Sequence, residues 1–81
     1  MELKKLNPVI KAFMQEVQFD VNDEPYYKVS SNYEPKGYRY HLRVKTPSIL
    51  HESNLIILCA FAYRHHLCLQ LEDHGAEFIF Y

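Results

Sequence analysis

The stretch Tyr38–Lys45 constrains the fold more than any other part of this 81-residue chain. Apolar or aromatic residues occupy every second position, and a cation or a histidine stands at each position between them. Because successive side chains of a strand point to opposite faces, this alternation predicts a strand with one buried face and one basic face. The buried face carries Tyr38, Tyr40, Leu42 and Val44, and the basic face carries Arg39, His41, Arg43 and Lys45.

A turn signal, Glu34-Pro35-Lys36-Gly37, comes directly before this strand, and a second candidate strand, Tyr26–Tyr33, comes before the turn. We expect the two strands to form a hairpin with a two-residue loop at Pro35-Lys36. This register keeps all the apolar side chains on one face. It pairs Tyr33 with Tyr38, Ser31 with Tyr40, Val29 with Leu42 and Tyr27 with Val44.

A second hairpin is predicted at the end of the chain. Leucines at 67, 69 and 71 alternate with polar residues, and His74-Gly75 is a typical two-residue hairpin turn. This turn pairs Leu71 with Phe78 and Leu69 with Phe80, again on one face. A further short strand is expected at residues 17–21, where Val17, Phe19 and Val21 alternate with Gln18 and Asp20.

Two helices are predicted. Asn7-Pro8 is typical of a cap followed by proline at the first helical position, and the apolar residues that follow have helical spacing: Val9, Ile10, Phe13, Met14 and Val17. Thr46-Pro47 repeats this signal for a helix that ends at His65 or His66, and the polar residues 51–54 are expected either to delay its start or to bend it. The apolar run Leu55–Tyr63 has little amphipathicity, which indicates a helix buried on more than one side. A buried strand is the alternative.

The expected architecture is an α+β two-layer sandwich that forms one domain, residues 1–81. An antiparallel sheet of about five strands carries two helices on one face, in the order α-β-β-β-α-β-β. This order is similar to the core of type III secretion chaperones and related small dimeric domains. Its first five elements also look like the double-stranded RNA-binding domain. Where that family presents a lysine cluster to RNA, this chain reads Thr46-Pro47-Ser48-Ile49-Leu50.

Composition excludes several classes of protein. Apolar residues make up 48% of the chain, which is too many for a disordered chain, and the net charge of −1 gives no global attraction to nucleic acid. The apolar run of residues 55–63 is too short to cross a bilayer as a helix, and the start of the chain lacks the apolar run of a signal peptide. The two cysteines do not make a disulfide framework. We therefore expect a cytoplasmic protein that does not contact a membrane.

The basic face of the sheet is one candidate binding site. Cations beside an aromatic ring on a sheet can hold single-stranded nucleic acid through phosphate contacts and stacking. The alternative is a solvated face whose cations are partly paired with Asp20 and Glu34. The far half of the same face is acidic to apolar, with Cys68, Gln70, Glu72, Glu77, Ile79 and Tyr81. The candidate binding residues are Tyr26, Lys28, Arg39, His41, Arg43 and Lys45.

Histidines and cysteines near the second helix form another candidate site. His65, His66 and Cys68, with Cys59, His51 or His74, supply ligand types that zinc prefers, but the chain has no Cys-x-x-Cys or His-x-x-x-His pair. We expect Cys59 to be an inert core residue, while Cys68 is open to solvent. No nucleophile motif or glycine-rich loop is present, so we expect no catalytic residues, no metal and no cofactor.

The apolar second helix is a candidate interface, because a core this small can hardly cover both of its sides. We expect a homodimer, with the interface residues Leu55, Leu58, Ala62, Ile79 and Tyr81. The expected function is a small non-enzymatic protein-interaction module that binds a protein partner through its open sheet face or second helix. Compact chains of this kind are common among small bacterial, phage and mobile-element proteins. By this analogy, we expect an inhibitor, an adaptor or a chaperone-like protein. Nucleic-acid binding by the basic face is the alternative.

Overall fold

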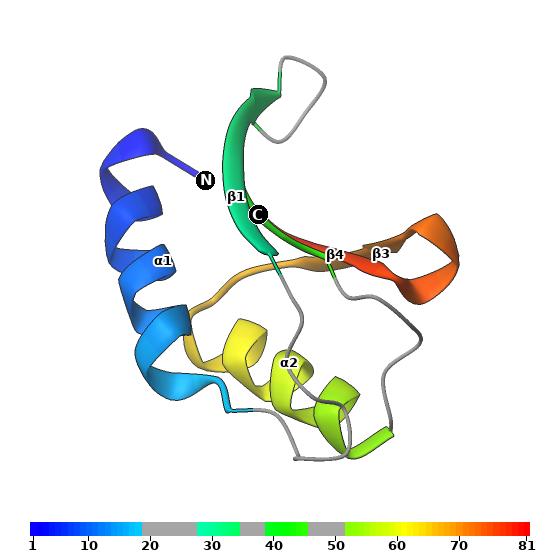
Figure 1. Cartoon of the computed structure of the whole chain (residues 1–81). Coiled ribbons are helices and arrows are strands. Elements are labelled where there is room, and N and C mark those ends of the chain that lie inside the picture. Colours follow the sequence, from blue (N-terminus) through cyan, green and yellow to red (C-terminus); the bar gives the residue numbers. More distant parts are fainter. Residues whose placement is uncertain (19–27, 35–38, 46–51) are drawn as a thin grey trace.

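A computed structural model describes residues 1–18, 28–34, 39–45 and 52–81 of the chain (Figure 1). These residues form an α+β fold. Its elements in chain order are α1 (Leu3–Glu16), β1 (Lys28–Glu34), β2 (Arg39–Lys45), α2 (Glu52–Arg64), β3 (Leu69–Glu72), the short 3-10 helix η2 (Asp73–Gly75) and β4 (Glu77–Phe80).

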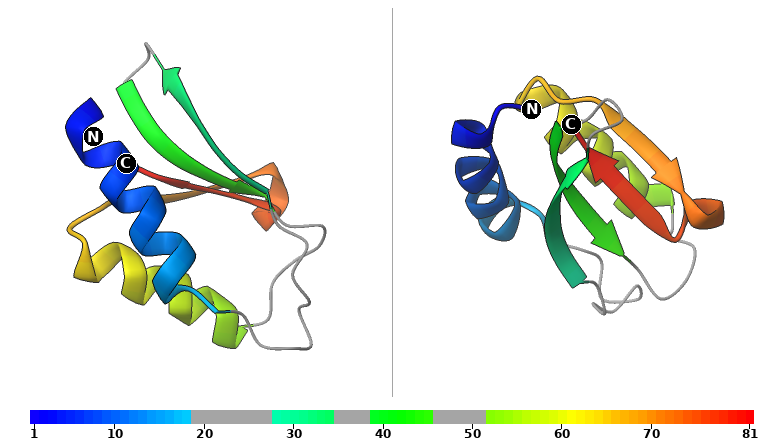
Figure 2. Two further views of the ribbon diagram at one scale, coloured as in Figure 1. Left: turned by 60° about the vertical axis from the view of Figure 1, so that its left-hand side comes forward. Right: turned by 90° about the horizontal axis from the view of Figure 1, so that it is seen from above.

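The described strands form one antiparallel sheet in the order β1-β2-β4-β3. Both helices lie on the same face of this sheet (Figure 2), as a two-layer sandwich requires. The described residues thus contain four strands rather than five. The additional strand was expected at residues 17–21, of which 19–21 lie outside the described part of the chain. The chain runs from β2 through α2 to β3, and β4 fills the place between β2 and β3.

The first hairpin has the predicted faces but not the predicted register. Tyr33 pairs with Tyr40 rather than with Tyr38, and Val29 pairs with Val44 rather than with Leu42. Strand β1 ends at Glu34 and β2 begins at Arg39, so four residues lie between the strands instead of two. A shift of two residues leaves every side chain on its original face, so the alternation of the sequence does not distinguish the two registers.

The second hairpin confirms the predicted register. Leu71 pairs with Phe78 and Leu69 with Phe80. The turn is centred on His74-Gly75 as predicted, and the amide of Ala76 donates to the carbonyl of Asp73 at 3.0 Å across it. It is longer than a two-residue turn, because residues 73–76 lie between the strands, and Asp73, His74 and Gly75 all have positive φ, of 52°, 55° and 88°.

Helix α1 begins at Leu3, so the expected start at Asn7-Pro8 is wrong. Pro8 lies inside the helix and removes one backbone hydrogen bond. The turn before it persists because Leu6 extends the buried stripe of Val9 and Phe13 by one turn. The terminal amino group of Met1 also donates to the carbonyl of Tyr40 at 2.8 Å, which ties the start of this helix to the sheet.

Residues 52–64 form a helix and not the alternative strand. The expected start at Thr46-Pro47 lies outside the described residues. The last turn closes with the pattern of a Schellman motif, because the amide of Leu67 donates to Ala62 at 2.8 Å and that of His66 donates to Tyr63 at 3.3 Å. His66 has a φ of 55°, a conformation that glycine adopts at lower cost.

The core lies between the two layers. Rings from both helices and from the central strand β4 meet in it: the centroid of Phe61 is 5.4 Å from that of Phe13 and 5.4 Å from that of Phe80. Phe13 and Phe80 are 5.8 Å apart. Edge-to-face contacts of this kind are favourable beyond the apolar area that they bury. Leu42 and Val44 of β2 complete the core on the sheet side, as the alternation of their segment predicts.

Candidate functional site

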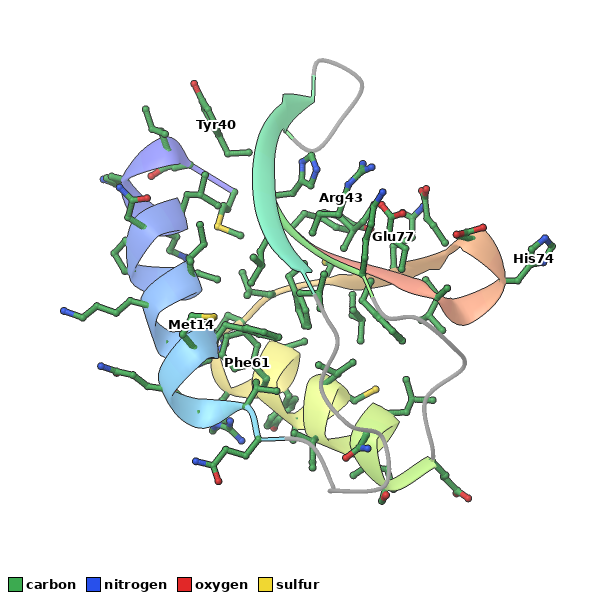
Figure 3. The ribbon with its side chains drawn as sticks, in the orientation of Figure 1. Met14, Tyr40, Arg43, Phe61, His74 and Glu77 are labelled. Atoms are coloured by element: carbon green, nitrogen blue, oxygen red, sulfur yellow. The ribbon has the colours of Figure 1, made fainter. Side chains whose placement is uncertain are left out.

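The sheet face opposite the helices contains an ion-pair cluster where β2 and β4 meet (Figure 3). Arg43 Nη1 lies 2.8 Å from Glu77 Oε1, and Lys45 Nζ lies 3.8 Å from Glu77 Oε2. The side chain of Glu77 is only 10% exposed and that of Arg43 is 25% exposed. The strand order explains the contact, since it places the acidic strand directly beside the basic one. Two of the predicted phosphate-binding cations are therefore already held by a carboxylate.

The other residues of the predicted basic site do not form an exposed cluster in the described part of the chain. The side chain of His41 is fully buried, so it presents no surface to a ligand. Tyr26 and Asp20 lie outside the described residues. The backbone places Lys28 opposite Lys45 at one end of the hairpin and Arg39 opposite Glu34 at the other, while the side chains of Lys28 and Arg39 are not described.

Three of the five predicted interface residues belong to the interior. Leu58 and Ala62 of α2 are core residues, and Ile79 of β4 is fully buried. Leu55 and Tyr81 are partly exposed. The prediction selected the side of α2 that faces the core, because an apolar run such as Leu55–Tyr63 has no polar side to show which direction is inward.

The opposite side of α2 carries an exposed apolar stripe. Ile56, Cys59, Ala60 and Tyr63 follow the spacing i, i+3, i+4, i+7, and all four are exposed. Tyr63 is 85% exposed and Ile56 is 59% exposed. We call these four residues the α2 outer face. The expectation that the helix is buried on more than one side is thus wrong for the single chain, and the expectation that Cys59 is a core cysteine is also wrong.

A polar cluster joins the C-terminal ends of the two helices, and no pattern in the sequence predicts it. Glu16 of α1 accepts from Arg64 Nη2 at 3.0 Å, and its other oxygen lies 3.0 Å from His65 Nε2. The hydrogen bond with His65, followed by that with Arg64, holds the pKa of Glu16 below its ordinary value. The cluster connects the two helices through residues that are 48 positions apart in the sequence, Glu16 and Arg64.

The described histidines and cysteines do not converge on a metal site. No group of three or more potential ligands lies together in the described residues, and His51 is outside them. His65 is engaged with Glu16, and His74 lies at the tip of the second hairpin. Cys68 is exposed, as expected. It lies directly before β3, and its backbone pairs with that of Tyr81.

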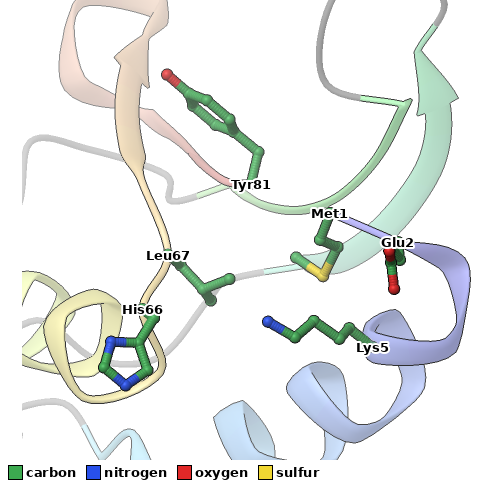
Figure 4. A pocket seen from close by; sticks show the side chains of 6 residues that line it. All are labelled: Met1, Glu2, Lys5, His66, Leu67 and Tyr81. Carbon is green, nitrogen blue, oxygen red and sulfur yellow. The ribbon is translucent and has the colours of Figure 1, made fainter.

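A pocket of about 340 Å³ lies where the two termini meet (Figure 4). Met1, Glu2, Lys5, His66, Leu67 and Tyr81 line it. The side chain of Lys5 reaches from α1 toward the loop that carries His66 and Leu67. The lining mixes one cation, one acid, one histidine and apolar groups, so it does not indicate a particular class of ligand.

Comparisons with protein-family models, with curated proteins and with solved structures found no match to this chain. Among the described residues, no helix combines the length and the apolar character that crossing a membrane requires. Two features of the described surface bear on function, the α2 outer face and the ion-pair cluster at Glu77.

Proposed function

We propose that this chain is a small non-enzymatic protein-interaction module that binds a protein partner through the α2 outer face. The exposure of Tyr63 and Ile56 on one side of an apolar helix is the observation that supports the proposal. Apolar residues that are exposed singly need no explanation, whereas a contiguous stripe of them is typical of a protein-binding surface. Tyrosine is also enriched at the centre of such surfaces.

Chemistry at this surface fits binding and not turnover. Of the four residues of the α2 outer face, only Cys59 carries a thiol, and none carries a carboxylate or an imidazole that could act as a base. A binding role is consistent with an inhibitor, an adaptor or a chaperone-like protein, all of which act by covering a surface of a larger partner. The sheet face is the weaker docking candidate, because Glu77 holds Arg43 and Lys45.

The experiment is affinity capture from the source organism with three forms of the chain: wild type, the double variant Ile56→Glu/Tyr63→Glu, and the control Leu3→Glu. Leu3 is 57% exposed on α1 and matches Ile56 in exposure and in residue class. A partner that wild type and the control retain, and that the double variant loses, supports the proposal. Equal capture by all three folded forms would reject this surface.

Nucleic-acid binding through the basic face remains the second proposal for the sheet. Its test is retention on single-stranded DNA or RNA across a salt series, because phosphate contacts give a steep dependence on salt. The variant Glu77→Gln releases Arg43 and Lys45 and is expected to increase retention. Retention that is absent at low salt for both wild type and Glu77→Gln would remove this alternative.

A further inference from the structure

The α2 outer face has a pattern that is symmetric about its own centre. Two large residues, Ile56 and Tyr63, stand at its ends, and two small residues, Cys59 and Ala60, stand in the middle. When a helix packs antiparallel on a copy of itself, this pattern places each large side chain opposite a large one at either end. The small centre then lets the two backbones approach closely.

The ends of the helix fit the same arrangement. In an antiparallel pair the two helix dipoles oppose each other, which places unlike ends together. A parallel pair would bring like ends together instead. The charge of Arg64, at the end of α2, is balanced within the chain, because its guanidinium lies 3.0 Å from Glu16.

We infer that the α2 outer face binds a second copy of this chain, in a two-fold antiparallel pair whose axis passes beside Cys59 and Ala60. A two-fold contact uses the same patch on both copies, and the order of large and small side chains on this patch is the same from either end. The four residues of this face are exposed, on the side of α2 opposite the core residues Leu58 and Phe61, so they are accessible to a second copy. This inference rests on the proposed function and names the partner.

The position of Cys59 makes the inference directly testable. Two packed helices have axes roughly 8–10 Å apart, so Cα atoms that face each other across the axis lie about 4–6 Å apart, a span that a disulfide can bridge. The thiol oxidant diamide should therefore link two copies through Cys59. Cys68 is also exposed but lies beyond the end of α2, where its backbone pairs with Tyr81, and it serves as the matched control thiol.

The experiment uses two single-cysteine variants. Cys68→Ser keeps Cys59 and is expected to give a covalent dimer of twice 9.7 kDa, which a reductant reverses. Cys59→Ser keeps Cys68 and is expected to remain a monomer on a denaturing gel. Adding Ile56→Glu to Cys68→Ser should reduce the linked fraction at least tenfold, while adding Leu3→Glu should leave it unchanged. Circular dichroism of each variant checks that it is folded.

Sedimentation equilibrium of the wild-type protein without oxidant gives the second readout. We expect reversible dimerisation with a dissociation constant on the order of tens of micromolar, because one helix face is a small interface. A monomer mass at about ten times that concentration would overturn the inference, as would equal linking through Cys59 and Cys68. Either result leaves the proposed function standing if capture of a partner still depends on Ile56 and Tyr63. If neither dimerisation nor capture depends on these residues, both the inference and the proposed function are rejected.

Discussion

The turn at Gly75 shows how one residue without a side chain sets a hairpin. Its φ of 88° is costly for any L-residue with a Cβ atom, yet a Cβ built there would meet nothing within 4 Å. We therefore predict that Gly75→Ala lowers the free energy of unfolding by about 1 kcal/mol, through backbone strain alone. Urea unfolding measures this loss. Gly75→Asn should cost less, since asparagine tolerates this conformation, and a larger loss for asparagine than for alanine would contradict the explanation.

Glu16 gives the fold a dependence on acid. Its hydrogen bonds with His65 and Arg64 lower its pKa in the folded protein, so the stabilisation is fully present above the pKa of the unfolded chain. It is lost as the pH falls through the lower, folded pKa. We predict that Glu16→Gln is less stable than wild type at neutral pH, and that the two converge once the pH falls below the folded pKa of Glu16. Thermal unfolding across a pH series tests this, and a difference that persists unchanged in acid would refute it.

Elements in this chain differ in how well their sequences specify them. The register of the second hairpin was predictable, because a turn centred on His74-Gly75 places Leu71 opposite Phe78. The first hairpin was predictable only in its faces, since registers that differ by two residues bury the same side chains. The strand order was not predictable, because pairing between β2 and β4 depends on contacts distant in sequence.

Helix α2 shows the corresponding limit for the candidate site. Its apolar run reveals that a helix forms, but burial of Leu58 and exposure of Tyr63 depend on where the sheet lies. Polar Asn54 is buried on the inner side and apolar Ile56 is exposed on the outer side, which reverses the usual expectation from residue type. The four residues of the α2 outer face were present in the sequence at helical spacing, and only the structure separates them from their buried neighbours.

The contact between β2 and β4 depends on one carboxylate. Glu77→Gln leaves Arg43 partly buried without its countercharge, so we predict a loss of about 1–3 kcal/mol in the free energy of unfolding. Glu72→Gln is the control, because Glu72 lies opposite Glu77 on β3 and is exposed. It should change stability by less than about 0.5 kcal/mol. Equal effects of the two substitutions in denaturant titrations would show that the ion pair contributes nothing.

At the scale of the whole molecule, the described strands form two hairpins that are each local in sequence, joined by one contact that is not. β1 with β2 and β3 with β4 are neighbours along the chain, whereas Leu42 pairs with Phe80 almost half the chain later. Helix α2 lies between the two hairpins in sequence and packs under the sheet that they form together.

This topology has a kinetic consequence. Each hairpin can close within microseconds, but joining them requires a long loop to close first, so the β2–β4 contact should limit the rate of folding. We predict that Leu42→Ala, at this contact, slows refolding, while Val9→Ala, on α1, mainly accelerates unfolding. Stopped-flow measurements in urea separate the two effects, and the reverse assignment would disprove the order. Formation of the contact between the two hairpins would then be the rate-limiting step of folding, although each hairpin forms quickly by itself.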